Sequence, residues 1–574
     1  MIQFTVLASI LLLLVLLIKS KYRPEILFPG VVVFYYFMGF LDTQTLLSNY
    51  TNPSLITLIL LLLVSIVIEK TTLITTIAAL IFKPSYHHSL FKLTAITSLL
   101  SAFLNNTAVV SSFLGMIKNN GRHAPSKLLI PLSYAAIFGG TVTLIGTSTN
   151  LIINGFVIEQ GMEPLKLFDF LYVGLPLTIA GIITLLLFAP KVLPEHAVEK
   201  ESCAHFFLET RIAENSPLIG KSIQANGFRN LESLFLAEII RGGKLISPVT
   251  PDEIVHANDE LIFTGDIEQV QHLKQFEGLE FFENKNDILN SNLVEVIISH
   301  ESTLLGKTIK AANFRTRFDA AVVAVRRGDE RLSGKIGLTE LEVGDRLVLA
   351  VGNDFYKRDN LNKNFYFISA LDTDKKLSPK ESLLVVGSFI AVIALSAFKV
   401  IAFIKGLIFL LLFFLAMRFT SLSQIKRRMP FDLILIIGSA LGISHVLIET
   451  GSAALLSNGI HTVFGSYGIY GAFVGVYLMT LLLTEVITNN AAAALAFPIA
   501  YATAMGMEAN LLPFVMAVAY GASASFMTPY GYQTNLMVYS VGEYSFKNYI
   551  KMGLPVSIVY SAVVLLLVPY FFPF

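Results

Sequence analysis

Two short stretches place pairs of adjacent asparagines inside otherwise apolar runs. The first is LNNTAVV, Leu104 to Val110, and the second is TNNAAAA, Thr488 to Ala494. In lipid an unpaired side-chain amide costs several kcal/mol, so each pair must be satisfied by protein, water or a bound ion. Asparagine is neutral and offers an oxygen to a cation and an N–H to an anion, which makes both pairs candidate ion-binding groups.

Each asparagine pair is followed by a second polar break at a matching distance. The breaks are IGTSTN, which ends at Asn150, and YGYQTN, which ends at Asn535. Asn105 lies 45 residues before Asn150, and Asn489 lies 46 residues before Asn535. The chain therefore contains an internal repeat. Paired interruptions of hydrophobic segments in two halves indicate the binding site of a secondary transporter.

The composition predicts a polytopic membrane protein. Of 574 residues, 54% are hydrophobic and only 14% are charged, and the mean hydropathy is +0.66, which excludes an ordinary soluble protein of this size. The net charge of +1 shows no excess of basic residues of the kind that binds nucleic acid. The single cysteine, Cys203, excludes an internal disulfide and a cysteine-based metal site. The first apolar run, Leu7 to Ile18, is expected to be a retained span.

The fold expected from hydropathy is an all-α polytopic membrane protein with two re-entrant hairpins and an inserted cytoplasmic α+β region. The hairpins are expected at 90–118 and 470–505, and spans with a polar break at 126–145 and 511–540. A weaker segment lies at 452–466, and 72–83 is expected at the membrane interface. The remaining expected spans are 4–18, 25–41, 53–68, 168–189, 379–398, 400–417, 430–449 and 552–572.

Clusters of lysine and arginine predict the orientation of the spans. Lys19, Lys21 and Arg23 follow the first span, and a second basic cluster, Lys426 to Arg428, follows a later one. Placing both clusters in the cytoplasm also places 190–376 there and gives the two halves opposite orientations, so the repeat is expected to be inverted.

A glutamate occupies the same place in each half. VSIVIEKT and SHVLIETG bring Glu69 onto Glu449, and both are interpreted first as interfacial anchors.

The hydrophilic insert is itself a repeat. Ser216 to Arg229 matches Ser302 to Arg315 at an offset of 86, and alternating strands with Gly, Asn and Asp turns follow each copy. The L-x-G-K-[ST]-I and GD-x-L-[VI] patterns resemble the C-terminal domain of RCK units, the regulators of potassium conductance. That resemblance implies regulation by a small molecule that binds these domains in the cytoplasm. The modules are hydrophilic and share no polar motif with the membrane core, so deleting 205–360 is expected to leave substrate binding intact and to alter its rate or regulation. The expected division is repeat 1 at 1–189, RCK-like domains at 205–285 and 290–360, and repeat 2 at 377–574.

The two tips and two breaks together resemble the divalent anion/sodium symporters, solute carrier family thirteen, within the ion-transporter superfamily. The family carries Ser-Asn-Thr at each hairpin tip and an I-G or T-P break in the partner helix. The tips here read Asn105-Asn106-Thr107 and Asn489-Asn490-Ala491, and the breaks contain Ile145-Gly146 and Thr528-Pro529. The resemblance covers both membrane halves. It implies two sodium sites, one per hairpin and partner break, an anion held between the tips, elevator movement and a homodimer.

Two departures from the family pattern bear on the substrate. Asn replaces the tip Ser at both sites, and Ala491 replaces the second tip Thr. One hydroxyl that would touch substrate is therefore lost, which favours a small anion such as sulfate over a dicarboxylate.

The residues expected to bind ions come from the four motifs. The substrate-binding set is Asn106, Thr107, Asn150, Asn490, Thr534 and Asn535. The sodium-binding set is Asn105, Asn106, Gly146, Ser148, Asn489, Asn490, Thr528 and Gly531.

Glu485 lies four residues before Asn489, where the first repeat has Ser101. An intramembrane carboxylate is a functional candidate, and Glu485 is expected to be a fixed charge supporting the second cation site. A proton carrier and a structural carboxylate remain open alternatives.

The function expected from these observations is sodium-coupled symport of a small divalent anion, most of all sulfate, in a bacterial cytoplasmic membrane. No organic cofactor and no enzymatic activity are expected, because neither H-E-x-x-H nor G-x-S-x-G occurs and the ten histidines are scattered. A di- or tricarboxylate symporter, a proton-coupled oxyanion transporter and a channel gated by the insert are the alternatives.

Overall fold

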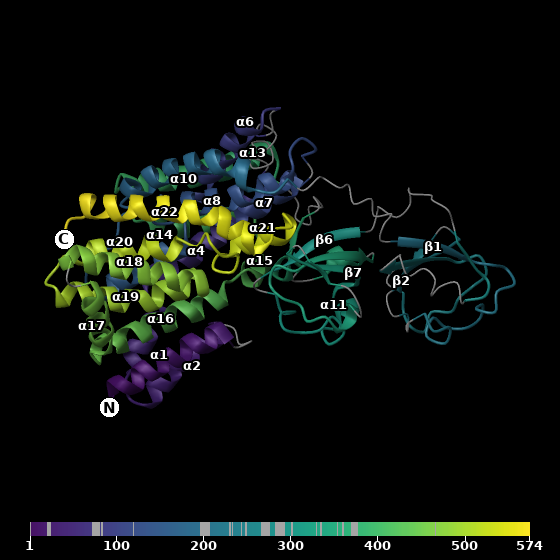
Figure 1. Ribbon diagram of the computed structural model, residues 1–574, viewed down its shortest axis with the longest axis horizontal. Coiled ribbons are helices and arrows are strands. Elements are labelled where there is room, and N and C mark those ends of the chain that lie inside the picture. Colours follow the sequence, from purple (N-terminus) through teal and green to yellow (C-terminus); the bar gives the residue numbers. More distant parts are fainter. Residues whose placement is uncertain are drawn as a thin grey trace.

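The fold is known from a computed structural model (Figure 1). The structure describes residues 2–19, 24–71, 81, 84–118, 120–195, 207–228, 231, 234–242, 244–246, 249–265, 276–281, 293–299, 302–328, 330–332, 336–352, 354–358, 361–368, 377–464 and 467–574. Most of the segment at 72–83, expected at the interface, lies outside these described residues.

The first half of the chain is helical up to the insert. The long apolar helix α4 begins at a local capping signal, with Asn52 as its N-cap and Pro53 at its first position. The helices are α1 (Ile2–Lys19), α2 (Pro24–Phe37), α3 (Thr43–Tyr50), α4 (Pro53–Glu69), α6 (Tyr86–Ser101), α7 (Asn106–Lys118), η1 (Pro125–Lys127), α8 (Leu129–Gly140), α9 (Ser148–Glu159) and α10 (Leu171–Val192).

The second half resumes beside the end of α4, where Leu377 N–H donates to the carbonyl of Lys70 at 3.0 Å. A capping box between Ser378 and Glu381 starts the first helix of this half. The helices are α13 (Pro379–Ala397), α14 (Phe403–Ala416), α15 (Leu422–Arg427), α16 (Phe431–Glu449), α17 (Ser452–Phe464), α18 (Gly468–Val486), α19 (Asn489–Gly506), α20 (Leu511–Ser523), α21 (Gln533–Val541) and α22 (Phe546–Phe571).

Among the described residues, seven helices are long and apolar enough to cross a membrane. Most of the spans predicted from hydropathy coincide with a helix within a few residues. Both predicted hairpins are helix–turn–helix pairs, α6–α7 and α18–α19, with the asparagines at the turn. Both spans predicted to break do so, between α8 and α9 and between α20 and α21. The protein is therefore a mostly helical, polytopic membrane protein.

The same contacts recur at the two breaks. In each half a threonine of the break donates its hydroxyl to a carbonyl near the hairpin tip, and its own carbonyl accepts from the asparagine that follows. The bonds are Thr143 to Ala102 O (2.5 Å) and Asn150 Nδ2 to Thr143 O (2.9 Å) in the first half, and Thr528 to Glu485 O (2.9 Å) and Asn535 Nδ2 to Thr528 O (3.4 Å) in the second.

The insert contains two modules, each built on a five-stranded antiparallel sheet. The strand orders, β3-β2-β4-β1-β5 and β10-β6-β9-β7-β8, are equivalent, and each sheet has a bulge at the same place, Leu236/Glu238 and Val322/Ala324. The strands are β1 (Phe207–Ile212), β2 (Leu234–Arg241), β3 (Lys244–Ile246), β4 (Glu260–Gly265), β5 (Leu279–Phe281), β6 (Leu293–Ile298), β7 (Ala320–Arg327), β8 (Glu330–Leu332), β9 (Arg346–Val351) and β10 (Phe365–Phe367), with α11 (Phe314–Phe318), η4 (Ile336–Leu338), η5 (Phe355–Lys357) and α12 (Leu361–Asn364) in the second module.

One arginine–aspartate pair recurs in both modules. Arg241 binds both carboxylate oxygens of Asp259, at 2.8 and 3.0 Å, and Arg327 binds Asp345 in the same bidentate way at 2.7 and 2.9 Å. These pairs fix the turn before β4 and before β9. The second module extends beyond the expected boundary at 360, because β10 pairs with β6.

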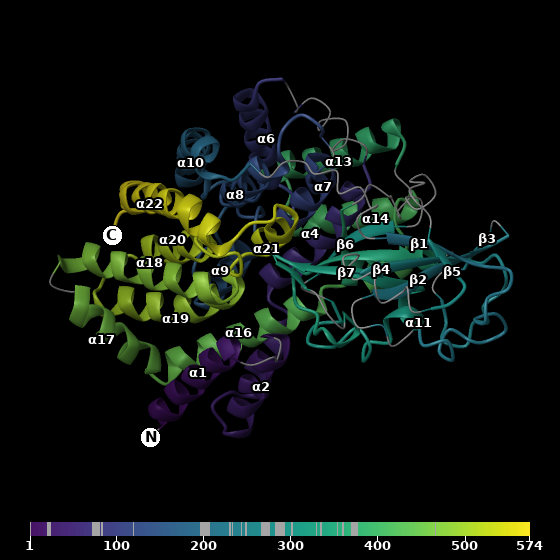
Figure 2. The ribbon, with the colours of Figure 1, turned by 45° about the vertical axis from the view of Figure 1, so that its right-hand side comes forward.

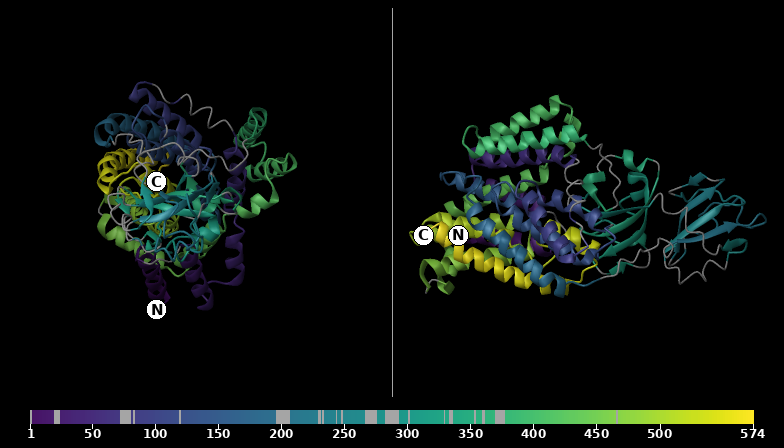
Figure 3. Two further views of the ribbon diagram at one scale, coloured as in Figure 1. Left: turned by 90° about the vertical axis from the view of Figure 1, so that its right-hand side faces the viewer. Right: turned by 90° about the horizontal axis from the view of Figure 1, so that it is seen from above.

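The two modules and the helical body lie in a row. Figure 1 and the right-hand view of Figure 3 show the second module against one end of the helices and the first module farthest from them. Helix α7 contacts β10, and Ser540 of α21 donates to Gly344 O at 2.6 Å; Figure 2 shows α21 beside this sheet. The second module therefore contacts the membrane helices.

Candidate functional site

Four helices begin in one polar layer beside a cavity of about 430 Å³. They are α7, α9, α19 and α21, and the wall includes residues from the first turn or N-cap of each, among them Asn106, Ser148, Asn490 and Gln533. Helix N-termini carry partial positive charge and free N–H groups, so this layer favours an anion. The four sequence motifs are thus brought together in space.

The tip of the first hairpin is hydrogen-bonded to the break of the second half. Asn106 Nδ2 donates to the Tyr532 hydroxyl at 2.7 Å, and Thr107 Oγ1 donates to Gln533 Oε1 at 3.1 Å. The Tyr532 hydroxyl also lies 3.3 Å from Thr147 Oγ1. Tyr532 therefore ties one tip to both breaks.

The tip of the second hairpin makes the reciprocal contacts. Ser148 Oγ and Thr149 Oγ1 donate to Asn490 Oδ1 at 3.0 and 3.3 Å, and Asn489 Nδ2 donates to Thr149 Oγ1 at 3.0 Å. Each tip thus bonds through its side chains to the break of the opposite half, in addition to the bonds from Thr143 to Ala102 O and from Thr528 to Glu485 O within each half.

Three residues expected to bind substrate are buried away from the cavity wall. Asn535 Nδ2 donates to Ser525 O at 3.0 Å, and Ser133 Oγ donates to Asn535 Oδ1 at 2.6 Å and to Thr534 Oγ1 at 2.8 Å. Asn150 and Asn535 are each at most 1% exposed. In this structure Asn150 and Asn535 hold the backbone of the breaks, and Thr534 bonds to the Ser133 side chain; none of the three lines the cavity.

Neutral oxygens are available for a cation near both breaks. Among the described residues, Asn150 Oδ1 and Ser525 Oγ are buried and have no hydrogen-bond partner, and a Cβ on Gly531 would lie 2.2 Å from Ser525 Oγ. Within the same residues no group of three His, Cys, Asp or Glu side chains is placed to hold a metal. Neutral oxygens of this kind are ligands that Na⁺ accepts in transporters.

Glu485 fastens the second break. Its carboxylate accepts from the backbone N–H groups of Phe526, Met527 and Thr528, each at 2.9 Å. In the first half the corresponding Ser101 donates instead to Asn106 Oδ1 at 2.5 Å. Glu485 therefore holds the backbone of the second break.

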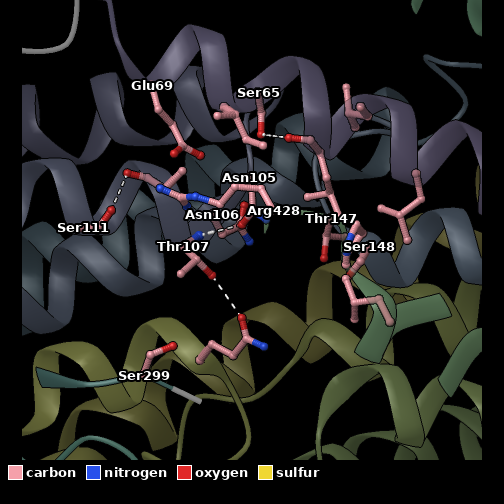
Figure 4. A pocket seen from close by; sticks show the side chains of 18 of the residues that line it. Ser65, Glu69, Asn105, Asn106, Thr107, Ser111, Thr147, Ser148, Ser299 and Arg428 are labelled. Carbon is pink, nitrogen blue, oxygen red and sulfur yellow. Dashed lines mark hydrogen bonds between the residues drawn. The ribbon is translucent and has the colours of Figure 1, made fainter. Parts of the chain in front are cut away.

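Several cavity residues were not identified from the sequence. Arg428 and Glu69 lie on one wall, and Figure 4 shows both side chains directed to the side of the cavity that carries Asn105. Arg428 was interpreted only as part of the cytoplasmic basic cluster, and Glu69 as an interfacial anchor. Glu69 ends α4 and Arg428 precedes α16, so only the packing of these two helices brings them to the cavity.

Comparison with known proteins gives a consistent answer. A model of a citrate transporter family, CitMHS, matches residues 2–519. A Chlamydomonas reinhardtii protein described as a sulfur deprivation response regulator is 30% identical over 550 residues, covering 91% of this chain and 93% of that protein. Sodium/sulfate cotransporter 1 of the same alga is 28% identical over 386 residues, 63% of this chain and 43% of the cotransporter. The uncharacterised transporter YfbS of Escherichia coli is 25% identical across 99% of both chains.

The sequence motifs had suggested the divalent anion/sodium symporters of the same superfamily. The matching model refines that assignment to a family named for citrate, while the relatives include proteins named for sulfate. With a match across most of the chain, this protein belongs to the CitMHS citrate transporter family and is a membrane transporter, not an enzyme.

Proposed function

We propose that this protein is a sodium-coupled symporter of a small divalent anion, sulfate above all. The observation that carries the proposal is the convergence of the N-termini of α7, α9, α19 and α21 on one cavity. Four positive helix ends provide N–H donors for an anion without an intramembrane cation at the tips. Arg428 on the cavity wall adds a permanent positive charge.

The substrate assignment rests on the chemistry of the tips and on the relatives. Asn106 and Asn490 present amide groups, while Ala491 presents a methyl group where the first tip has Thr107. Fewer hydroxyls favour a compact dianion that is satisfied by N–H donors. Two relatives have names connected to sulfate or sulfur supply, which supports the same choice. Citrate is the competing substrate, because the family is named for it.

Sodium coupling is proposed from the neutral oxygens near the two breaks. Asn150 Oδ1 in the first half and Ser525 Oγ in the second are buried acceptors without a partner in the part of the chain that the structure describes. Asn105, Asn489 and the backbone at Gly146 and Gly531 lie in the same motifs. Neutral oxygens do not titrate near neutral pH, so they bind Na⁺ but cannot carry a proton. We therefore assign one sodium site to each break, with Glu485 as the supporting charge of the second.

The transport cycle that we propose uses the two halves as inverted repeats. Figure 1 shows α7 toward the insert and α18 and α19 toward the opposite end, as entry from opposite faces requires. The recurrence of the threonine and asparagine contacts at both breaks supports equivalence of the halves. An elevator movement of both hairpins and breaks, in a homodimer in a bacterial cytoplasmic membrane, completes the proposal. The insert is cytoplasmic, and its modules, RCK-like in sequence, are regulatory.

The test is uptake of radiolabelled sulfate into proteoliposomes containing the purified protein. An inward Na⁺ gradient should drive accumulation above the outside concentration, and excess unlabelled sulfate should compete better than succinate or citrate. Stronger competition by citrate would show that citrate, not sulfate, is the substrate. Uptake driven by a pH gradient in the absence of Na⁺ would show that the proton, not sodium, is the coupling ion. Equilibration without accumulation would indicate a channel.

A further inference from the structure

The second module is held against the membrane helices by a continuous ion network. Glu295 on β6 binds Lys118 at the end of α7 and Arg346 on β9, the latter at 3.2 Å. Arg346 also reaches Glu543, just after α21, at 3.4 Å, and Arg326 binds the same carboxylate. The network therefore joins the module to an arm of the first hairpin and to the broken helix of the second half.

The backbones of the second module and of the membrane helices pack closely against each other at this interface. A Cβ on Gly115 of α7 would lie 2.5 Å from the carbonyl of Ile368. Ser540 Oγ of α21 donates to Gly344 O at 2.6 Å. Ile297 and Ile368 of the module are buried in the same apolar cluster as the membrane helices. The module thus forms a fixed surface on the two elements that carry the candidate site.

The module also supplies part of the cavity wall. Ser299, Lys363 and the strand Phe365–Phe367 line the cavity together with Arg428 and the first hairpin tip. Figure 4 shows Ser299 on the wall opposite Glu69. The charged residues on the wall are Glu69, Lys70, Lys363, Arg428 and Asp432, which is three cations against two carboxylates. Lys363 is the cation that the insert contributes.

The first module lacks these features at the equivalent positions. The pairing of Phe365 with Ile298 and of Leu279 with Ile212 shows that the offset of 86 holds into the last strand of each sheet. Lys363 therefore corresponds to Glu277, an exposed residue of opposite charge. Arg326 and Arg346 of the ion network correspond likewise to Ile240 and Glu260. Basic residues therefore occupy these three positions in the second module, which contacts the cavity, and not in the first.

We propose that Lys363 of the second module is a substrate-positioning residue, which forms with Arg428 an anion subsite on the insert side of the transport cavity. A dianion that enters or leaves on this side meets Lys363 before it reaches the hairpin tips. The insert then contributes directly to the permeation path in addition to any regulatory role. This inference rests on the proposed anion transport but adds a residue and a side of the membrane to it.

The test compares substrate affinity on the two faces of the membrane. Sulfate transport, with citrate in parallel, is measured in inside-out and right-side-out vesicles containing wild type, Lys363→Arg, Lys363→Ala or Lys363→Glu. The matched control is Glu277→Lys, at the equivalent place in the first module. Lys363→Ala should raise the half-saturating concentration on the insert side about three-fold and Lys363→Glu about ten-fold. Lys363→Arg, the control and the opposite face should stay near wild type.

Higher ionic strength should shrink the difference between Lys363→Glu and wild type, because the subsite acts through charge. An unchanged half-saturating concentration in Lys363→Glu, with wild-type transport intact, would overturn the subsite alone. An equal rise on both faces would also overturn it, since the residue would then act through folding. Absence of transport of both anions by the wild type would overturn the proposed function together with this inference.

Discussion

Replacing Arg346 with alanine should release the second module from the membrane helices. Arg346 is the centre of the ion network, since it contacts both Glu295 and Glu543. Its side chain is only 6% exposed, and the two carboxylates are 27% and 33% exposed. Removing it leaves two carboxylates that were neutralised by a nearly buried guanidinium.

The magnitude follows from this burial. Breaking a buried ion pair by removing one partner costs about 3–5 kcal/mol. Here each carboxylate keeps a second cation, Lys118 for Glu295 and Arg326 for Glu543, and each is partly exposed. We therefore expect a loss of about 2–3 kcal/mol in docking free energy, a shift of about 30- to 150-fold toward the undocked state.

Hydrogen exchange measured by mass spectrometry on the full chain tests this value, because amide protection reports the free energy of local opening. Protection of β9 and of the end of α21 should fall by that factor, while α18 and α20 keep theirs. The control is Arg211→Ala, which removes an exposed pair with Glu260 at 3.9 Å and should cost less than about 1 kcal/mol. Equal protection in both variants would refute the network as the docking element.

The same network predicts a pH dependence. Burial alone would raise the pKa of Glu295, but Arg346 and Lys118 together hold that pKa below its usual value. A carboxylate with a depressed pKa stabilises the docked state above its ordinary pKa, about 4.3, and loses that contribution as the pH falls through the docked pKa. Docking in wild type should therefore weaken on acidification below about pH 4.3, and Arg346→Ala should show a smaller change.

Three variants of the candidate site should have separable effects. Tyr532→Phe removes the hydroxyl that accepts from Asn106 and should weaken sulfate binding about ten-fold, measured by equilibrium binding, if one buried bond of 1–2 kcal/mol is lost. Gly140→Ala places a Cβ 2.7 Å from Asn106 Nδ2 and should abolish binding, whereas Gly387→Ala, with nothing within 4 Å, should bind normally. Glu485→Gln removes the negative charge and replaces one oxygen by an NH2 group, so at least one of the three backbone N–H groups loses its acceptor. It should therefore lower thermal stability and weaken, without abolishing, the Na⁺ dependence of uptake; full Na⁺ dependence at normal stability would contradict its role as a supporting charge.

Much of the helical framework follows directly from the sequence. Hydropathy and the repeated Asn pairs place the turn between α6 and α7 and the turn between α18 and α19, because a polar tip inside an apolar run is incompatible with an uninterrupted span. The glycine-containing breaks likewise separate α8 from α9 and α20 from α21. These features are local, so periodicity and composition determine them.

The contacts that complete the site depend on packing between distant elements. Asn106 and Tyr532 are separated by 426 positions, and Lys118 and Glu295 by 177. Nothing in the pattern around Glu295 shows that β6 would face α7. The insert was expected to be separable from the core, yet its second module lines the cavity. A deletion of 205–360 would remove Ser299 and leave β10 without its partner β6, so we expect it to disturb the cavity wall.

The most direct test of the central claim is equilibrium binding of radiolabelled sulfate to the purified protein as Na⁺ is varied at constant ionic strength. We expect the sulfate Kd to fall steadily as Na⁺ replaces K⁺. In Asn490→Ala we expect most of this Na⁺-dependent increase in sulfate affinity to be lost. A sulfate Kd that is independent of Na⁺, or unaffected by removal of the Asn490 amide, would contradict an anion site built from the two hairpin tips and coupled to sodium.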